Sequence, residues 1–245
     1  MSPDHQALLT ELRQTARPIR GDRPEQNDSY GGSGRPFYNV SVPARRAMVR
    51  RWLAAHKADP AEAGLALIDS LFGGESHEEK TLAALLLRES PRLRRAASPA
   101  DVDRWLGQVR GWAEVDSICQ NAFTPEEMMA DWPAWKALIE ALAASANINK
   151  RRAALVLLTG PVHYSDDPRF RDLALAVIDR LMAERDILIT KAVSWLLRAM
   201  VTRHREAVER CLAEQAASLP KIAIRETRTK LTTGTKSGKS GSTSS

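Results

Sequence analysis

A tryptophan and an aspartate lie four residues apart in the segment GWAEVDSIC, at Trp112 and Asp116. Residues at positions i and i+4 share one face of an α-helix. A carboxylate beside an indole ring suits a cationic ligand, because the carboxylate supplies negative charge and the ring face attracts cations. The structural alternative is a partly buried tryptophan beside a capping or salt-bridged aspartate. The pair is therefore a candidate anionic pocket with an aromatic wall.

Two later segments place basic residues in apolar surroundings. The run 150–152, Lys-Arg-Arg, stands at a predicted helix start, where positive charge opposes the helix dipole and an external anion could explain it. Lys191, Trp195 and Arg198 lie at positions i, i+4 and i+7, so they share one helical face. In an ordinary apolar helix, the tryptophan would belong to the core and the flanking cations would be solvated.

The candidate residues recur at similar intervals. Arg152 lies 36 residues after Asp116, and Trp195 lies 43 residues after Arg152. Both intervals approximate one HEAT-like helical repeat of about 40–47 residues. Residues at that interval on stacked repeats line one surface, so we expect these residues to line a single concave groove.

The sequence lacks the spacing signals of metal- or nucleotide-dependent chemistry. None of the five histidines pairs with another histidine, a cysteine or a carboxylate at metal-ligand spacing. No phosphate loop, dinucleotide fingerprint or Ser/Cys nucleophile with a local base is visible. Cys119 and Cys211 fall in apolar helical stretches, which indicates packing residues in a reducing compartment. We therefore expect no metal and no cofactor.

Apolar residues recur at helical spacing along most of the chain, and no segment shows the sustained alternation of a strand. A Pro/Gly/Asn-rich loop is expected over about 18–42. Ser76 and Glu79 predict a capping box, Gly111 is expected to break a helix, and Gly160-Pro161 is expected to stop one. The predicted helices cover about 3–15, 43–57, 60–72, 77–86, 98–109, 112–122, 131–144, 148–159, 170–181, 187–200 and 205–216, with short ones after Pro125 and Pro220.

These helices predict an all-α fold, a curved HEAT-like helical-repeat solenoid with a concave groove. The structural alternative is an irregular helical bundle. We expect one repeat domain over residues 1–231 and a flexible basic Gly/Ser/Thr/Lys tail over 232–245. The N-terminus lacks the pattern of a signal peptide, and no apolar run approaches the roughly 20 residues that span a bilayer.

Net charge points weakly to a polyanion partner. The 245 residues carry 36 Lys+Arg and 30 Asp+Glu, a formal net charge of +6. Six basic residues and one acidic residue fall in the last 25 residues, so the rest of the chain is nearly neutral. A basic tail is either a solubilising segment or a salt-sensitive nucleic-acid contact. Any basic surface on the body must arise from clustering.

The chain resembles the AlkD-type DNA alkylation repair family, which consists of HEAT-like-repeat alkylpurine DNA glycosylases. The resemblance extends from about Tyr30 to Leu231. The ordered set of motifs is more specific than the Trp-x-x-x-Asp motif by itself. One departure is Gly111, where the best-known members have a second tryptophan. The matching segments are YGGSGRPFYNVSVPARR, EEKTLAALLL, GWAEVDSIC, NINKRRAALVLL and ILITKAVSWLLR.

The resemblance implies an activity and a set of site residues. The family hydrolyses the N-glycosidic bond of cationic N-alkylated purines, such as 3-methyladenine and 7-methylguanine, in duplex DNA, without a metal. Asp116 matches the catalytic carboxylate, and Trp112 and Trp195 match its aromatic neighbours. The DNA-binding set combines family matches with Lys191 of the helical face described above. Its members are Arg152, Lys191, Tyr30, Arg45 and Arg46, the last two at the DNA-facing surface.

Two other classes of function stay open on the sequence. A non-catalytic paralogue would bind damaged or branched DNA, and a HEAT-like scaffold would bind protein. For the enzyme, we expect duplex DNA containing alkylated bases as the partner, no membrane, a monomer, and a bacterial-type cytoplasmic location associated with the nucleoid through DNA.

Overall fold

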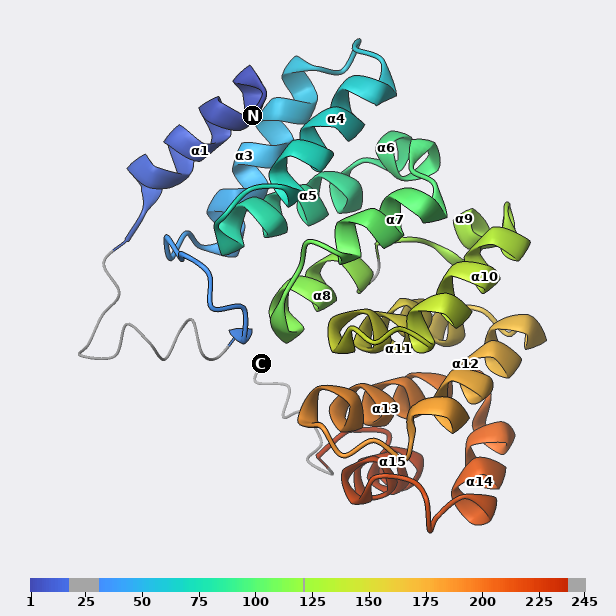
Figure 1. The fold of residues 1–245 in the computed structure, drawn as a ribbon. Coiled ribbons are helices and arrows are strands. Elements are labelled where there is room, and N and C mark those ends of the chain that lie inside the picture. The colour runs from blue at the N-terminus through green and yellow to red at the C-terminus, as the bar shows by residue number, and fades with distance from the viewer. Residues whose placement is uncertain (18–30, 121, 238–245) are drawn as a thin grey trace, which may run out of the picture. The chain divides into compact units, whose positions relative to one another are not determined.

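The computed structural model describes residues 1–17, 31–120 and 122–237 (Figure 1). Over these ranges the chain forms fourteen helices and no strand, which confirms the all-α prediction. The chain divides into two compact units, residues 1–123 and 124–245. The first unit contains α1 (Pro3–Thr15), α3 (Val42–Ala55), α4 (Ala61–Phe72), α5 (His77–Glu89), α6 (Pro91–Ala96), α7 (Pro99–Leu106) and α8 (Gly111–Cys119). The second contains α9 (Pro125–Met129), α10 (Trp132–Ala143), α11 (Ile148–Tyr164), α12 (Pro168–Leu181), α13 (Ile187–Met200), α14 (Arg205–Glu214) and α15 (Lys221–Thr233).

Each unit has a row of neighbouring helices with further helices packed against it. In the first unit α5 contacts α3 on one side and α8 on the other, and α4 and α6 also pack on α5 (Figure 1). In the second unit α13 lies between α11 and α15, while α10 and α12 pack on α11 and α14 packs on α13. Stacked helix pairs of this kind define a helical-repeat protein, so that prediction is confirmed. The concave groove and the single domain over 1–231 stay predictions. None of the described helices is both long and apolar enough to span a membrane.

Side-chain caps fix most helix starts at the predicted places. The Ser76 hydroxyl accepts the Glu79 N–H, and the Glu79 carboxylate accepts the Ser76 N–H, which confirms the predicted capping box of α5. Ser98 and Thr124 cap α7 and α9 in the same way. The Asp186 carboxylate accepts the Leu188 N–H at the start of α13. Each cap pairs N–H groups that the first helical turn leaves free.

The predicted stop at Gly160-Pro161 is wrong. Helix α11 continues through both residues to Tyr164, and the Ser165 N–H bonds to the Pro161 carbonyl at 2.9 Å. A proline inside a helix costs about 3 kcal/mol, because it lacks an N–H and its ring crowds the preceding turn. The eleven consecutive residues 152–162 are all buried. Burial on every side of this central helix therefore outweighs the local signal.

Three smaller expectations also need correction. The six-residue helix α6 was not predicted, because it is too short to show a periodic pattern. Gly111 does not end the helix before it: α7 already ends at Leu106, and Gly111 is the first residue of α8. Thr232 and Thr233, expected in the tail, form the last residues of α15. Residues 238–245 of that tail lie outside the described residues.

A buried polar cluster attaches α1 to α4 and α5. His5, which is 2% exposed, has Nε2 at 2.6 Å from Glu79 Oε1 and Nδ1 at 2.7 Å from Ser70 Oγ. Burial by itself would raise the pKa of Glu79, but hydrogen bonds from His5 and Ser76 lower that pKa from 4.5 to about 2. The charged form of Glu79 is thus favoured by folding.

We expect the stability of the first unit to fall in acid because of Glu79. A carboxyl whose pKa is lower in the folded state stabilises the fold above its unfolded pKa, and that contribution disappears as pH falls from about 5 to about 2. Its size is about 2–3 kcal/mol at neutral pH. Glu79→Gln should lower the free energy of unfolding by urea at pH 7 and flatten its decline between pH 5 and pH 3. Glu62→Gln, at an exposed site on α4, is the control. Parallel pH profiles for wild type and Glu79→Gln would contradict this assignment.

Candidate functional site

A cavity of about 300 Å³ lies on the first unit, where one face each of α3, α5 and α8 meet. Trp112 and Asp116, one turn apart on α8, both line it. The predicted pairing of indole and carboxylate on one helical face is therefore present. Both side chains are half-buried, so they combine a fixed position with access from solvent.

Helix α8 starts at a close approach of two backbone segments. Gly111 has φ +69°, and a Cβ at this position would lie 2.2 Å from the Gly31 carbonyl oxygen and 2.4 Å from the Gly32 carbonyl carbon. Only glycine meets both conditions, because it has no Cβ and tolerates positive φ. The departure from the family pattern noted above thus coincides with the point where the loop reaches α8.

Glu114, which the sequence analysis did not single out, connects α8 to the preceding loops through hydrogen bonds. Its carboxylate is 0% exposed and accepts the Arg110 N–H at 2.8 Å and the Arg35 Nε–H at 3.3 Å. Arg35 also donates to the Gln108 carbonyl at 2.7 Å. The loop before α3 is thereby tied to the helix that carries Trp112 and Asp116. An acidic residue in the first turn of a predicted helix was the available signal.

Basic side chains also line the cavity, beside apolar and neutral polar residues of the same helices. Arg45 lines the cavity from α3, and His77 and Arg88 line it from α5. Arg45 is 8% exposed, its guanidinium donates to the Thr81 hydroxyl, and its Nε has no hydrogen-bond partner within the described chain. Burial lowers the pKa of Arg45, and attraction to Glu78 partly opposes this effect.

The two arginines of the Arg45-Arg46 pair have different surroundings, and their place at the DNA-facing surface stays a prediction. Arg45 continues the buried stripe of Met48, Val49 and Trp52 on α3, so it forms a wall rather than an exposed contact. Arg46 lies in an ion pair with Glu89, at 3.0 Å. The two neighbours therefore have different surroundings, because successive residues on a helix point about 100° apart. Tyr30, the other predicted contact in this region, lies outside the described residues.

The second unit carries the remaining predicted residues on α11 and α13. Arg152, 5% exposed, donates to the Leu188 carbonyl at 2.6 Å and so contacts the first turn of α13. Lys191 follows three residues after Leu188 and is exposed, and Trp195 is half-buried one turn further along. The structure thus brings Arg152 beside the helix of Lys191 and Trp195. Their union with Trp112 and Asp116 in one groove stays a prediction.

Two cations of this unit have protein partners that the sequence did not predict. Arg151 forms a two-point ion pair with Glu184, at 2.8 and 3.1 Å, so its charge needs no external anion. Arg198, which the structural alternative would leave solvated, lies 3.4 Å from Glu226. Glu226 also accepts the Ser194 hydroxyl at 2.7 Å, which joins α13 to α15. Burial lowers the pKa of Arg198, and Glu226 partly opposes that shift.

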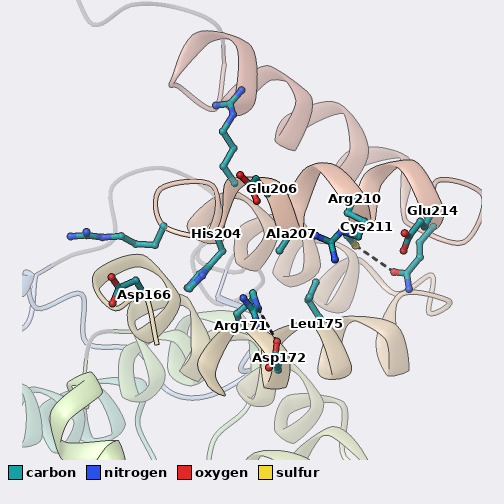
Figure 2. Close-up of a pocket in the computed structure, with 13 residues that line it drawn as sticks. Asp166, Arg171, Asp172, Leu175, His204, Glu206, Ala207, Arg210, Cys211 and Glu214 are labelled. Atoms are coloured by element: carbon teal, nitrogen blue, oxygen red, sulfur yellow. Dashed lines mark hydrogen bonds and ion pairs between the residues drawn. The ribbon is translucent and has the colours of Figure 1, made fainter. Parts of the chain in front are cut away.

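A larger cavity, of about 630 Å³, lies between α12 and α14, and Figure 2 shows its lining. Its four arginines are balanced by four acidic residues, and Arg171 pairs with Asp172 at 2.8 Å (Figure 2). The Cys211 thiol donates to Gln215 at 3.4 Å. Burial lowers the pKa of His204 and favours its neutral form, and the hydrogen bond to the Ser165 carbonyl partly opposes this shift. None of the predicted site residues lines this cavity. Size alone therefore does not identify the site.

The Ser70–His5–Glu79 contacts have the order of a hydrolase triad, but the surroundings lack its second requirement. Acyl transfer needs free donors that bind the developing oxyanion. The nearby N–H groups of Gly73 and Gly74 are already bonded to the carbonyls of Asp69 and Leu71. The cluster is therefore explained by helix attachment.

No group of three His, Cys, Asp or Glu side chains suited to a metal occurs among the described residues.

Comparison with known proteins identifies the family to which this helical-repeat protein belongs. A family model described as DNA alkylation repair enzyme matches residues 8–231. The chain belongs to that family, which assigns it to the repair of alkylated DNA. A solved structure described as a predicted DNA alkylation repair enzyme from Enterococcus faecalis has a TM-score of 0.62 and 19% identity, covering 89% of this chain and 98% of that one. At that identity the likeness shows the fold alone. No curated protein matches the chain.

Proposed function

We propose that the chain is a monofunctional DNA glycosylase that hydrolyses the N-glycosidic bond of cationic N-alkylated purines, such as 3-methyladenine and 7-methylguanine, in duplex DNA. The observation that carries this proposal is the cavity in which Asp116 and Trp112 lie on one face of α8, beside cationic residues. An anionic group with an aromatic neighbour suits a reacting centre that gains positive charge. The cations suit the phosphates on either side of that centre.

The chemistry requires little more than a fixed negative charge. An alkylated purine is cationic, so the C1′–N bond breaks with its electron pair moving to the base, which leaves neutral. Positive charge builds up on the deoxyribose, and the Asp116 carboxylate would stabilise it. Water then adds to C1′, and its proton passes to Asp116 or to solvent. Trp112 and, in the second unit, Trp195 would pack against the sugar and backbone. The proposal includes no metal and no cofactor.

One experiment separates this proposal from its rivals. Release of 7-methylguanine from methylated duplex DNA is measured beside binding to the same duplex. The buffer has the ionic strength of cytoplasm, because we propose that the chain acts there as a monomer. A glycosylase releases the base and binds the duplex. A non-catalytic paralogue would bind damaged or branched DNA without release, and a protein-binding scaffold would do neither.

We propose that Lys191 contacts a DNA phosphate directly, whereas Arg152 mainly holds α13 in place. Lys191 is exposed and has no partner among the described residues, while 95% of the Arg152 surface is covered and its guanidinium bonds to Leu188. Lys191→Ala should weaken duplex binding a few-fold and reduce the slope of log affinity against log salt by about 1, without loss of stability. Arg180→Ala, an exposed cation on α12, is the control.

We expect Arg152→Ala to destabilise the second unit by about 1–3 kcal/mol, because the hydrogen bond from the buried Arg152 guanidinium to the Leu188 carbonyl is lost. Thermal unfolding measures this effect, and binding is compared at a temperature where the variant is folded. A variant as stable as wild type, with a reduced salt slope, would instead make Arg152 the direct phosphate contact that the family resemblance implies.

A further inference from the structure

The cavity at Asp116 has more positive than negative side chains in its wall. Arg45 and Arg88 are cationic, Asp116 is the acidic residue that lines it, and His77 adds a further ring nitrogen. Such a wall is unsuited to a cationic nucleobase by itself. It suits a ligand that brings a positive reacting centre and a negative group together, as a nucleotide with its backbone phosphate does.

Arg45 is buried without a compensating carboxylate contact. It is more than nine-tenths buried, its hydrogen bond goes to the neutral Thr81 hydroxyl, and its Nε is unpaired within the described chain. Glu78, the acidic residue that acts on it, has its carboxylate bonded to the N–H groups of Tyr38 and Val40, at 3.0 and 3.3 Å. A buried guanidinium is costly unless an anion completes its surroundings. Arg45 is therefore prepared for an anionic ligand.

Arg88 is the exposed counterpart at the same cavity. It lies eleven residues after His77 on the cavity face of α5, and it forms no hydrogen bond or ion pair through its side chain with the described residues. Its neighbours differ in this respect, since Arg46 and Arg50 both pair with Glu89 at 3.0 Å. Glu89 thus pairs with both of these α3 arginines, whereas Arg88 has no carboxylate partner among the described residues.

We propose that Arg45 and Arg88 form a phosphate subsite that holds the DNA-backbone phosphodiester next to the nucleotide whose sugar lies at Asp116. This inference rests on the proposed function and specifies how its site binds DNA. The Asp116 carboxylate repels a phosphate, and two guanidinium groups on the other walls offset that repulsion. Because they neutralise charge that is present before and during the reaction, their effect falls on binding and KM rather than on kcat.

A single neutral linkage tests this subsite. The probe is a duplex with a central tetrahydrofuran abasic analogue, carrying one methylphosphonate linkage at each backbone position in turn. With wild type, one linkage next to the analogue should weaken binding about tenfold, as loss of a charge-assisted hydrogen bond does. With Arg88→Ala, binding to the unmodified probe should be about tenfold weaker. In this variant, the same neutral linkage should weaken binding by less than a further factor of about two. Arg88→Lys should restore most of the affinity but less of the dependence on that linkage.

Controls and the second arginine complete the design. Arg95→Ala, an exposed cation on α6 of the same unit, should keep the full tenfold dependence. Arg45→Gln retains an amide for Thr81 and should also lose the dependence, with its fold checked by circular dichroism. The proposal is overturned if Arg88→Ala keeps the full dependence at every linkage, or if Arg45→Gln does. Stabilisation of wild type but not Arg88→Ala by inorganic phosphate, without coupling to any linkage, would also overturn it.

The proposed function is tested separately, by base release from methylated duplex. Loss of the linkage dependence in a chain that releases no base would leave a DNA-binding subsite without the glycosylase. Base release that disappears with Asp116→Asn, together with unchanged linkage dependence in Arg88→Ala, would leave the glycosylase without this subsite.

Discussion

Asp116→Asn is expected to lower the rate of 7-methylguanine release from methylated duplex DNA by at least about 100-fold. The substitution keeps the size of the side chain and removes its negative charge. Only the charge stabilises the cationic sugar, so the loss should appear in the chemical step. Binding of the duplex should be unchanged or tighter, because one repulsion with the phosphates disappears.

The measurement is the amount of free base, separated by chromatography, against time under single-turnover conditions. An incubation without protein gives the spontaneous loss of base. Asp59→Asn, in the loop before α4 and away from the cavity lining, is the matched control and should retain wild-type rates. Unfolding by urea shows whether Asp116→Asn is folded. Equal release by Asp116→Asn and wild type would exclude Asp116 as the catalytic carboxylate.

Gly111→Ala is expected to cost about 3 kcal/mol of stability or more and to reduce base release with it. A positive φ costs a residue with a Cβ about 1–2 kcal/mol. The new Cβ would also lie 2.2 Å from the Gly31 carbonyl oxygen, so the loop or the start of α8 must move. Trp112 is the next residue, and Asp116 follows one turn later. A displacement at Gly111 therefore moves both site residues.

Gly34→Ala separates the cost of a positive φ from the cost of a steric clash at the new Cβ. Gly34 has φ +63°, but a Cβ there would meet nothing within 4 Å, so it should cost only about 1 kcal/mol. Urea denaturation followed by circular dichroism gives both free energies of unfolding. Base release is then compared without urea, at a temperature where both variants are folded. If Gly111→Ala is as stable as Gly34→Ala, the close packing of the loop on α8 is not a constraint.

The local signals of the sequence were sufficient for most of the helices. The capping box at Ser76 and Glu79 and the cap at Asp186 are read from residues within one turn, and both are present in the structure. The failure at Gly160-Pro161 has the opposite origin. There the helix-breaking residues are local, but the burial of residues 152–162 depends on packing against α10, α12 and α13. The sequence of one segment does not show how deeply other helices bury it.

The candidate site divides in the same way. The spacing of Trp112 and Asp116 determined by itself that they share a face of one helix, since helix geometry fixes positions four residues apart. That Arg45 and Arg88 line the same cavity depended on the packing of α3, α5 and α8.

The sequence by itself determined the helix class, most helix starts, and the tryptophan–aspartate pair on α8, because each depends on residues within one or two turns. Only the tertiary structure decided which charges are compensated. Arg151 and Arg46 are matched by Glu184 and Glu89, whereas Arg88 is left with no such partner among the described residues. Ion pairs join helices whose residues lie tens of positions apart, so the charge available to a ligand is a property of the packed helices.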